Sequence, residues 1–220
     1  MPPMKVPRAC FPSSVLITKK YFLKEDGSLF QSQTDLDEDK DRQVFEGYVF
    51  AAGGKSREDK VTVFCERFAI RDQKWEQMGS LHQKRLNASM QAFSLDQGLF
   101  IFGGEDEFGN LLDSIEQYTF ASNSWRLLNV TFPQACAQMS VYKVTSKKLL
   151  LLGGLKEEEK NDYLFKVKSK DVFTFNVHNQ ELEQIVQNPL SEEVLSIYPC
   201  FQIIDSEFGS LLRGAYVNTQ

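Results

Sequence analysis

The chain of 220 residues is 42% hydrophobic and carries a formal net charge of −5. This length and apolar content suffice for one sizeable core, or for an array of repeats that share one. The acidic balance gives no overall attraction to nucleic acid or to an anionic membrane. No apolar stretch approaches the roughly 20 residues of a membrane-spanning helix, so we expect a soluble protein without membrane insertion.

The first segment, residues 1–14, is predicted to be an extension outside the folded domain. It contains four prolines and no continuous apolar run, which argues against a secretory signal. Residues 1–24 carry five basic and no acidic side chains, as organelle presequences do. The prolines would interrupt the amphipathic helix of such a presequence, but organelle targeting stays open.

Three glycine pairs recur at a fixed interval along the rest of the chain. They are Gly53-Gly54, Gly103-Gly104 and Gly153-Gly154, and successive pairs lie 50 residues apart (from 53 to 103, and from 103 to 153). Each pair follows a short apolar run of strand length. A period near 50 residues is typical of units that are single small sheets, which bury their faces by stacking on copies of themselves.

The second unit shows most clearly how one repeat is built. Residues 89–95 and 99–102 are two apolar-rich runs separated by a tight turn, and the second run ends at a glycine pair. A loop then leads to residues 114–120, and a polar turn leads to a fourth run at 125–130. Helical periodicity is weak throughout. The sequence therefore predicts an all-β chain of four-stranded antiparallel meanders.

Aromatic residues keep a constant register behind the glycine pairs. In the first unit Phe68 lies 14 residues after the second glycine, and Trp75 lies 7 further on. Tyr118 and Trp125 have the same two offsets in the second unit. We expect these aromatic side chains to supply contact area between neighbouring sheets, and the glycines to allow positive φ and close backbone approach.

The third unit departs from this register. Phe175 lies 21 residues after Gly154, an excess of 7 over the other units. The excess fits an insertion around the charge-dense stretch 156–160 (KEEEK), which a surface loop accommodates at little cost.

This pattern resembles the kelch repeat, in which a glycine pair is followed by an aromatic residue 14 positions on and by a tryptophan 21 positions on. The resemblance covers about residues 47–186. It implies a kelch-type β-propeller, whose blades are four-stranded antiparallel sheets arranged in a ring.

We expect a single propeller domain over residues 15–220, with three blades between two half-blades. Their expected limits are about 15–46 (half-blade), 47–86, 87–132, 133–190 and 194–217 (half-blade). Strands from the two ends could pair and close a four-bladed ring, which would remove exposed sheet edges. The alternative is an incomplete propeller that a partner chain or a second copy completes.

The segment from Asp35 to Glu46 is the most suggestive candidate for a cation site. Its acids fall at positions 1, 3, 5, 7 and 12, as in a calcium-binding EF-hand loop. However, Lys40 stands where that loop needs glycine, and Arg42 stands where it carries an apolar residue. A solvated acidic loop is the competing interpretation.

The remaining chemistry-bearing residues do not form a recognisable catalytic pattern. His82 and His178 are the only histidines, and neither has a cysteine or another histidine nearby. The four cysteines are isolated, as small buried hydrophobes are. We therefore expect no cofactor, no metal and no enzymatic activity. A small propeller enzyme with a metal in the central channel is the alternative.

The kelch resemblance implies protein binding through loops on one propeller face. These loops follow each glycine pair or lead into the next blade. The residues expected there are Lys55, Arg57, Lys84, Arg85, Asn87, Glu105, Asp106, Phe108 and Gln134. Arginine and exposed aromatic side chains are frequent interface anchors, so Arg85 and Phe108 are the first candidates.

The predicted function is that of a non-catalytic scaffold module, acting as a subunit or adaptor in a larger assembly. We expect protein partners, no nucleic acid and a cytoplasmic location. The kelch resemblance adds a cytoskeletal or ciliary structural protein as an alternative, because such proteins occur in that family.

Overall fold

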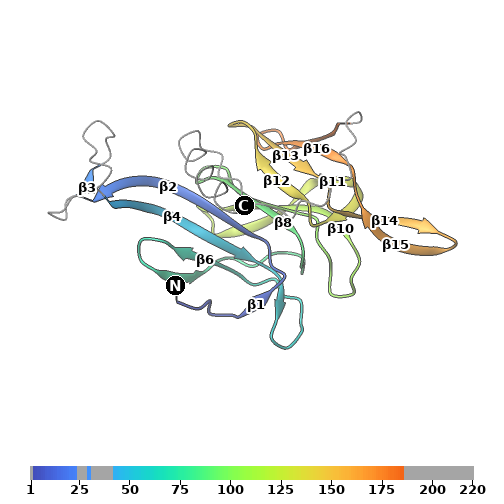
Figure 1. Cartoon of the computed structure of the whole chain (residues 1–220), viewed down its shortest axis with the longest axis horizontal. Helices are drawn as coiled ribbons and strands as arrows, with labels where there is room; N and C mark the ends of the chain where they lie inside the picture. Colours follow the sequence, from blue (N-terminus) through green and yellow to red (C-terminus); the bar gives the residue numbers. More distant parts are fainter. Residues whose placement is uncertain (1, 24–28, 31–41, 186–220) are drawn as a thin grey trace, which may run out of the picture.

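The computed structural model describes residues 2–23, 29–30 and 42–185 (Figure 1). This part of the chain consists of seventeen β-strands joined by turns and loops, without a helix. The described residues thus contain no helix long and apolar enough to cross a membrane. The all-β class predicted from the sequence is confirmed. The predicted half-blade at 194–217 and most of the acidic segment, residues 35–41, lie outside the described residues.

The first sheet, called sheet I, is an antiparallel meander of four strands with a short fifth strand at its edge. The strand order is β3-β2-β4-β6-β7. The bounds are β2 (Ser13–Leu23), β3 (Leu29–Phe30), β4 (Arg42–Ala52), β6 (Cys65–Ala69) and β7 (Lys74–Gln77). The first glycine pair directly follows β4, the second strand of the meander.

The pairing in sheet I differs from the half-blade predicted at 15–46. Strand β2 pairs with β4 over almost its whole length, from Ser13 opposite Ala51 to Leu23 opposite Arg42. It is therefore the first strand of the first meander rather than part of a preceding one. The last residues of the acidic segment, 42–46, lie in β4 and not in a loop.

The second sheet, sheet II, contains the four runs predicted for the second repeat. Their bounds are β8 (Ser89–Ser94), β9 (Gly98–Phe102), β10 (Leu112–Thr119) and β11 (Ser124–Ala137). Sheet III has the same connectivity, with β12 (Ser140–Lys143), β13 (Lys148–Leu152), β16 (Val172–Asn176) and β17 (Glu181–Gln184). In both sheets the glycine pair again follows the second strand.

The extra residues of the third unit form a β-hairpin rather than an irregular loop. Its strands are β14 (Leu155–Lys160) and β15 (Tyr163–Lys168). Strand β14 pairs with the end of β11, through Cys136 opposite Lys156 and Ala137 opposite Leu155. The hairpin therefore extends sheet II, and it projects away from the other strands in Figure 1.

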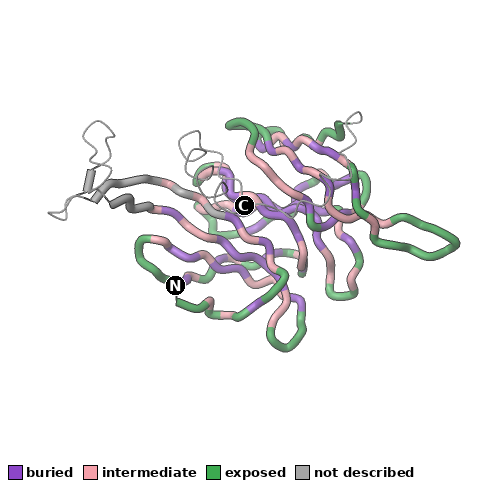
Figure 2. Tube along the Cα trace, viewed as in Figure 1, coloured by how far each residue is buried: buried purple, intermediate pink, exposed green. Residues whose placement is uncertain are grey.

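The three sheets stack face to face, as the repeat period requires. Alternate residues of β9 serve both contacts: Leu99 and Ile101 belong to the core shared with sheet I, whereas Phe100 and Phe102 belong to the core shared with sheet III. The rings of Phe100 and Phe175 lie 5.4 Å apart across the second of these contacts. Figure 2 shows the corresponding run of buried residues through the middle of the molecule.

The first strands of the three sheets lie side by side. Ser14 Oγ of β2 accepts a hydrogen bond of 2.8 Å from the Ala92 amide of β8. Ser89 Oγ of β8 in turn donates to the Met139 carbonyl just before β12, at 2.6 Å. Successive first strands in contact are the arrangement expected around the axis of a propeller, with which the three sheets are consistent.

The glycine pairs join neighbouring sheets where no side chain would fit. Gly104 has a φ of +106°, and its amide donates to the Cys136 carbonyl at 2.8 Å. A Cβ atom on Gly104 would lie 2.8 Å from both Leu86 O and Ala88 Cβ. Both the backbone conformation and the close packing therefore require glycine here.

Candidate functional site

Five of the nine residues predicted for the binding face line one groove. The groove has a volume of about 940 Å³ and lies between the loop that follows the glycine pair of sheet I and the equivalent loop of sheet II. The five residues are Lys55, Lys84, Glu105, Asp106 and Phe108. Arg57, Asn87 and Gln134 do not line it. We call this feature the interblade groove.

Phe108 stands at the tip of a tightly bonded loop on the rim of this groove. Its exposed fraction is 82%, the largest among the exposed large hydrophobic residues described. The Asp106 carboxylate accepts hydrogen bonds from the backbone amides of Phe108 (2.8 Å) and Asn110 (2.9 Å). It also accepts one from Asn110 Nδ2 at 2.9 Å. The loop is thus held in shape before any partner arrives, which lowers the entropic cost of binding through Phe108.

Hydrogen bonding also sets the ionisation of Asp106. Slight burial acts to raise the pKa of this carboxyl, but the hydrogen bonds from Asn110, Phe108 and Gly109 outweigh it and lower the pKa below its ordinary value. The carboxylate therefore stays charged and keeps its acceptor role at neutral pH.

The walls of the interblade groove carry charges of both signs. Lys55 pairs with Asp59 at 2.7 Å, and Lys84 pairs with Glu107 at 2.8 Å, both in partly exposed positions. Exposed ion pairs of this kind contribute little to stability, so their members are available for contacts with another chain. The groove suits a polar, charged surface with at least one apolar contact for Phe108.

The hairpin β14–β15 contacts the groove through Lys166 and exposes further apolar side chains. Lys166 of β15 forms an ion pair with Glu105, which also accepts a hydrogen bond of 2.8 Å from Asn87 Nδ2. Tyr163, Leu164 and Phe165 are 71%, 68% and 51% exposed on the same strand. The sequence prediction placed only a charged loop at this point and did not include these residues. The run Tyr-Leu-Phe, separated by two residues from the charged stretch 156–160, is the available signal.

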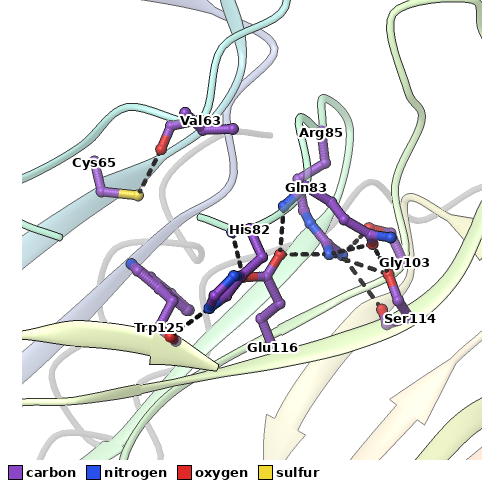
Figure 3. A network of polar contacts seen from close by, with 9 residues as sticks. All are labelled: Val63, Cys65, His82, Gln83, Arg85, Gly103, Ser114, Glu116 and Trp125. Atoms are coloured by element: carbon purple, nitrogen blue, oxygen red, sulfur yellow. Dashed lines mark hydrogen bonds and ion pairs between the residues drawn. The ribbon is translucent and has the colours of Figure 1, made fainter. Parts of the chain in front are cut away.

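The structure contradicts the expectation that Arg85 is a surface anchor. Its side chain is fully buried and forms an ion pair of 2.7 Å with the equally buried Glu116 (Figure 3). Its guanidinium also donates to the Gly103 carbonyl at 2.8 Å and to Ser114 Oγ at 3.1 Å. Burial lowers the pKa of Arg85 from its ordinary value, and the charge of Glu116 opposes this effect. Arg85 is a structural residue.

The same carboxylate holds the segment that leads into sheet II. Glu116 accepts hydrogen bonds from the amides of His82 (2.8 Å) and Gln83 (3.2 Å). The His82 ring is fixed in turn by a contact of 2.7 Å between Nε2 and the Trp125 carbonyl (Figure 3). These partners give His82 a structural role.

Sheet I contains an equivalent ion pair, which sequence reasoning also missed. Arg8 and Glu66 lie 3.1 Å apart, both with fully buried side chains, and Arg8 donates to the Gly53 carbonyl at 3.3 Å. Glu66 and Glu116 each lie 13 residues after the first glycine of the preceding glycine pair, and the sequence alone shows this constant spacing. The segment 1–14 is therefore not an extension outside the fold, because Arg8 is part of the core and β1 (Arg8–Ala9) pairs with β5 (Lys55–Ser56).

The other chemistry-bearing residues are dispersed. Within residues 2–23, 29–30 and 42–185, no group of three His, Cys, Asp or Glu side chains is placed to hold a metal ion. Cys65 and Cys136 are buried, and burial raises the pKa of both thiols to about 12. These two thiols are therefore protonated and serve as small apolar side chains, whereas Cys10 is exposed.

Comparisons with known proteins match sheet II and its register to one repeat family. Residues 89–129 match the family model of the kelch motif. Among curated proteins, the chain is similar to Kelch-like protein 38 of Rattus norvegicus, with 28% identity over 108 residues. The kelch resemblance is thus confirmed for residues 89–129, which carry a kelch motif. The 108 residues matched to that relative are 49% of this chain but only 18% of the relative.

Proposed function

We propose that this protein is a non-catalytic protein-interaction module that binds its partner at the interblade groove. One observation carries the proposal: Phe108 is 82% exposed on a loop that Asp106 holds in place, at the rim of a groove of about 940 Å³. A protruding aromatic side chain on a pre-ordered loop is a favourable interface anchor. The similarity to a Kelch-like protein supports an interaction role.

The role we assign is that of a subunit or adaptor in a larger assembly in the cytoplasm. Cytoskeletal and ciliary assemblies are the candidates that the kelch resemblance suggests. We further propose that sheets I to III are consecutive blades of one propeller. Because the strands of the predicted half-blade 15–46 belong to sheet I, we favour the other alternative of the sequence prediction, an incomplete propeller that a partner chain or a second copy completes.

Affinity purification with mass spectrometry tests the groove as the binding surface. The tagged wild type is compared with Phe108→Ala and with Leu95→Ala as the matched control. Leu95 is also exposed (48%), but it lies in the turn between β8 and β9, at the opposite end of β9 from the groove.

Burying the Phe108 side chain in a complex is worth about 1.5–3 kcal/mol, so the Phe108→Ala variant should bind its partner roughly 10- to 100-fold more weakly. The Leu95→Ala variant should recover the same proteins as the wild type. Equal recovery by the Phe108→Ala variant, with an unchanged melting temperature, would refute the groove assignment.

A further inference from the structure

The loops that enter successive sheets correspond residue by residue. The Gly54 amide donates to the Arg85 carbonyl, and the Gly104 amide donates to the Cys136 carbonyl, both at 2.8 Å. Cys136 therefore occupies, on entry to sheet III, the backbone position that Arg85 occupies on entry to sheet II. The position of the buried arginine is filled by a thiol in sheet III.

Sheet III also lacks the glutamate of the ion pair. In sheet II, Glu116 pairs with Ile101, the residue two before the glycine pair. The corresponding residue of sheet III is Leu151, and its partner is Phe173. Both members of the buried ion pair are thus replaced by side chains without charge.

A cavity lies where the arginine side chain would be. It has a volume of about 380 Å³, and Cys136, Gly153, Asp171 and Phe173 are among its lining residues. This volume is many times that of one water molecule and falls within the range of small-ligand pockets. We call it the third-sheet pocket.

The acceptors that Arg85 uses in sheet II have counterparts in this pocket. Arg85 donates to the carbonyl of Gly103, and Gly153 is the equivalent glycine. The Gly103 amide donates to the Ser114 carbonyl and the Gly153 amide to that of Asp171, so Asp171 stands where Ser114 stands.

This last replacement restores a negative charge. Arg85 donates to Ser114 Oγ at 3.1 Å, and a carboxylate occupies the same position in sheet III. The Asp171 carboxylate accepts from Ser169 Oγ at 2.6 Å and from Gln184 Nε2 at 3.2 Å. These two donors orient the carboxylate at the pocket, and Lys156 forms a salt bridge of 3.6 Å with it.

Lys156 faces a second carboxylate besides Asp171. Lys156 Nζ lies 3.6 Å from Asp171 and 3.7 Å from Glu158, so it is shared between two carboxylates. A second cation at Asp171 would release Lys156 to Glu158 on the exposed side of the hairpin. The buried ring of Phe173 lines the pocket, and an aromatic face favours a planar guanidinium.

We propose that the third-sheet pocket binds an arginine side chain of a protein partner. The guanidinium bridges the Gly153 carbonyl and the Asp171 carboxylate, as the guanidinium of Arg85 bridges Gly103 and Ser114. The fork of N–H donors on arginine suits two acceptors better than the single ammonium of lysine does.

This inference rests on the proposed protein-binding function and names a side chain that the partner must supply. The pocket and the interblade groove lie on either side of the hairpin β14–β15. Gln134, which lines the pocket, bonds to the carbonyl of Glu157 in β14, and Lys166 of β15 pairs with Glu105 in the groove. The hairpin therefore contacts residues of both sites.

An NMR titration of the ¹⁵N-labelled full chain tests the pocket directly. The probe is the peptide acetyl-Gly-Arg-Gly-amide at millimolar concentration, and the matched control is the same peptide with citrulline, which has the same shape without the charge. The arginine peptide should give saturable shifts at the amides of Gly153 and Asp171. The citrulline peptide should bind at least tenfold more weakly.

Two variants locate the binding. Asp171→Asn should weaken the arginine peptide at least tenfold, whereas Asp162→Asn, at the exposed hairpin tip, should not. Cys136→Arg should fill the pocket from within and abolish the peptide shifts. If Cys136→Arg does not fold, the comparison of Asp171→Asn with Asp162→Asn decides the question.

Absence of saturable shifts at Gly153 and Asp171, or equal binding of the two peptides, overturns the pocket. Either result leaves the groove untouched, because partner capture by the Phe108→Ala variant is a separate measurement. Conversely, the Phe108→Ala variant should bind the arginine peptide as the wild type does. Failure of the pocket and failure of the proposed function are therefore distinguishable.

Discussion

Replacing Arg85 with alanine removes the counterion of a carboxylate that solvent does not reach. The side chains of Arg85 and Glu116 are both fully buried, at a separation of 2.7 Å. The same substitution removes the donors to the Gly103 carbonyl and to Ser114 Oγ. The Arg85→Ala variant should therefore be destabilised, and its free energy of unfolding should fall well below that of the wild type.

The magnitude follows from what remains buried. Removing one partner of a buried ion pair costs about 3–5 kcal/mol, because the other charge stays in the core without compensation. For a domain of this size, about 2–4 °C of melting temperature is lost per kcal/mol, so we expect a decrease of about 6–20 °C. Arg57 is exposed, and the Arg57→Ala control should change the stability by no more than about 0.5 kcal/mol.

Urea unfolding measured by tryptophan fluorescence gives the comparison. The chain has two tryptophans, Trp75 in sheet I and Trp125 in sheet II, and both are buried. Glu116→Gln should also be destabilising, because it leaves the Arg85 charge buried and unpaired. A loss of less than about 1 kcal/mol for Arg85→Ala would refute the structural role of this ion pair.

Three further outcomes follow from individual residues. In urea unfolding, Gly104→Ala should lower the free energy of unfolding by about 2 kcal/mol or more. Gly109→Ala should lower it by at least about 1 kcal/mol less than Gly104→Ala does. Both glycines have positive φ, but a Cβ atom on Gly109 would meet nothing closer than 3.9 Å. The pKa of Asp106 is lowered, so its hydrogen bonds stabilise the loop fully at pH values above the ordinary pKa of 3.8. This stabilisation should be lost as the pH falls through the lowered pKa. Loosening of the Phe108 and Asn110 amides near pH 5 would contradict this prediction. In a Cys200→Ser variant at pH 8, a thiol reagent should modify only Cys10 quickly, because burial raises the pKa of Cys65 and Cys136 to about 12. Fast modification of all three thiols would contradict the burial of these two cysteines.

The repeat architecture could be predicted because it depends on local signals. Glycine pairs at positive φ and aromatic residues at fixed offsets report strand ends and stacking contacts within about 20 residues. The predicted runs of the second unit therefore match β8 to β11. The first strand of sheet I could not be placed in the same way, because β2 and β4 are separated by a long insertion that breaks the register.

The binding face could be predicted only in part, for an electrostatic reason. A charged residue in a loop is normally solvated, so the sequence predicts Arg85 at the surface together with its neighbour Lys84. Its burial depends on Glu116, 31 residues away, and on two backbone carbonyls that only the folded sheet brings together. The glutamate found 13 residues after the first glycine in units one and two was the signal for this contact, and its absence from unit three marks the third-sheet pocket.

Site-specific photo-cross-linking tests the central claim, that a protein partner binds at the interblade groove. A photoreactive phenylalanine analogue is placed at position 108 in one variant and at position 95 in another. Both positions are exposed, but they lie at opposite ends of β9. We expect a covalent adduct with the partner from position 108 only. Equal adducts from both positions, or an adduct from position 95 alone, would contradict the account.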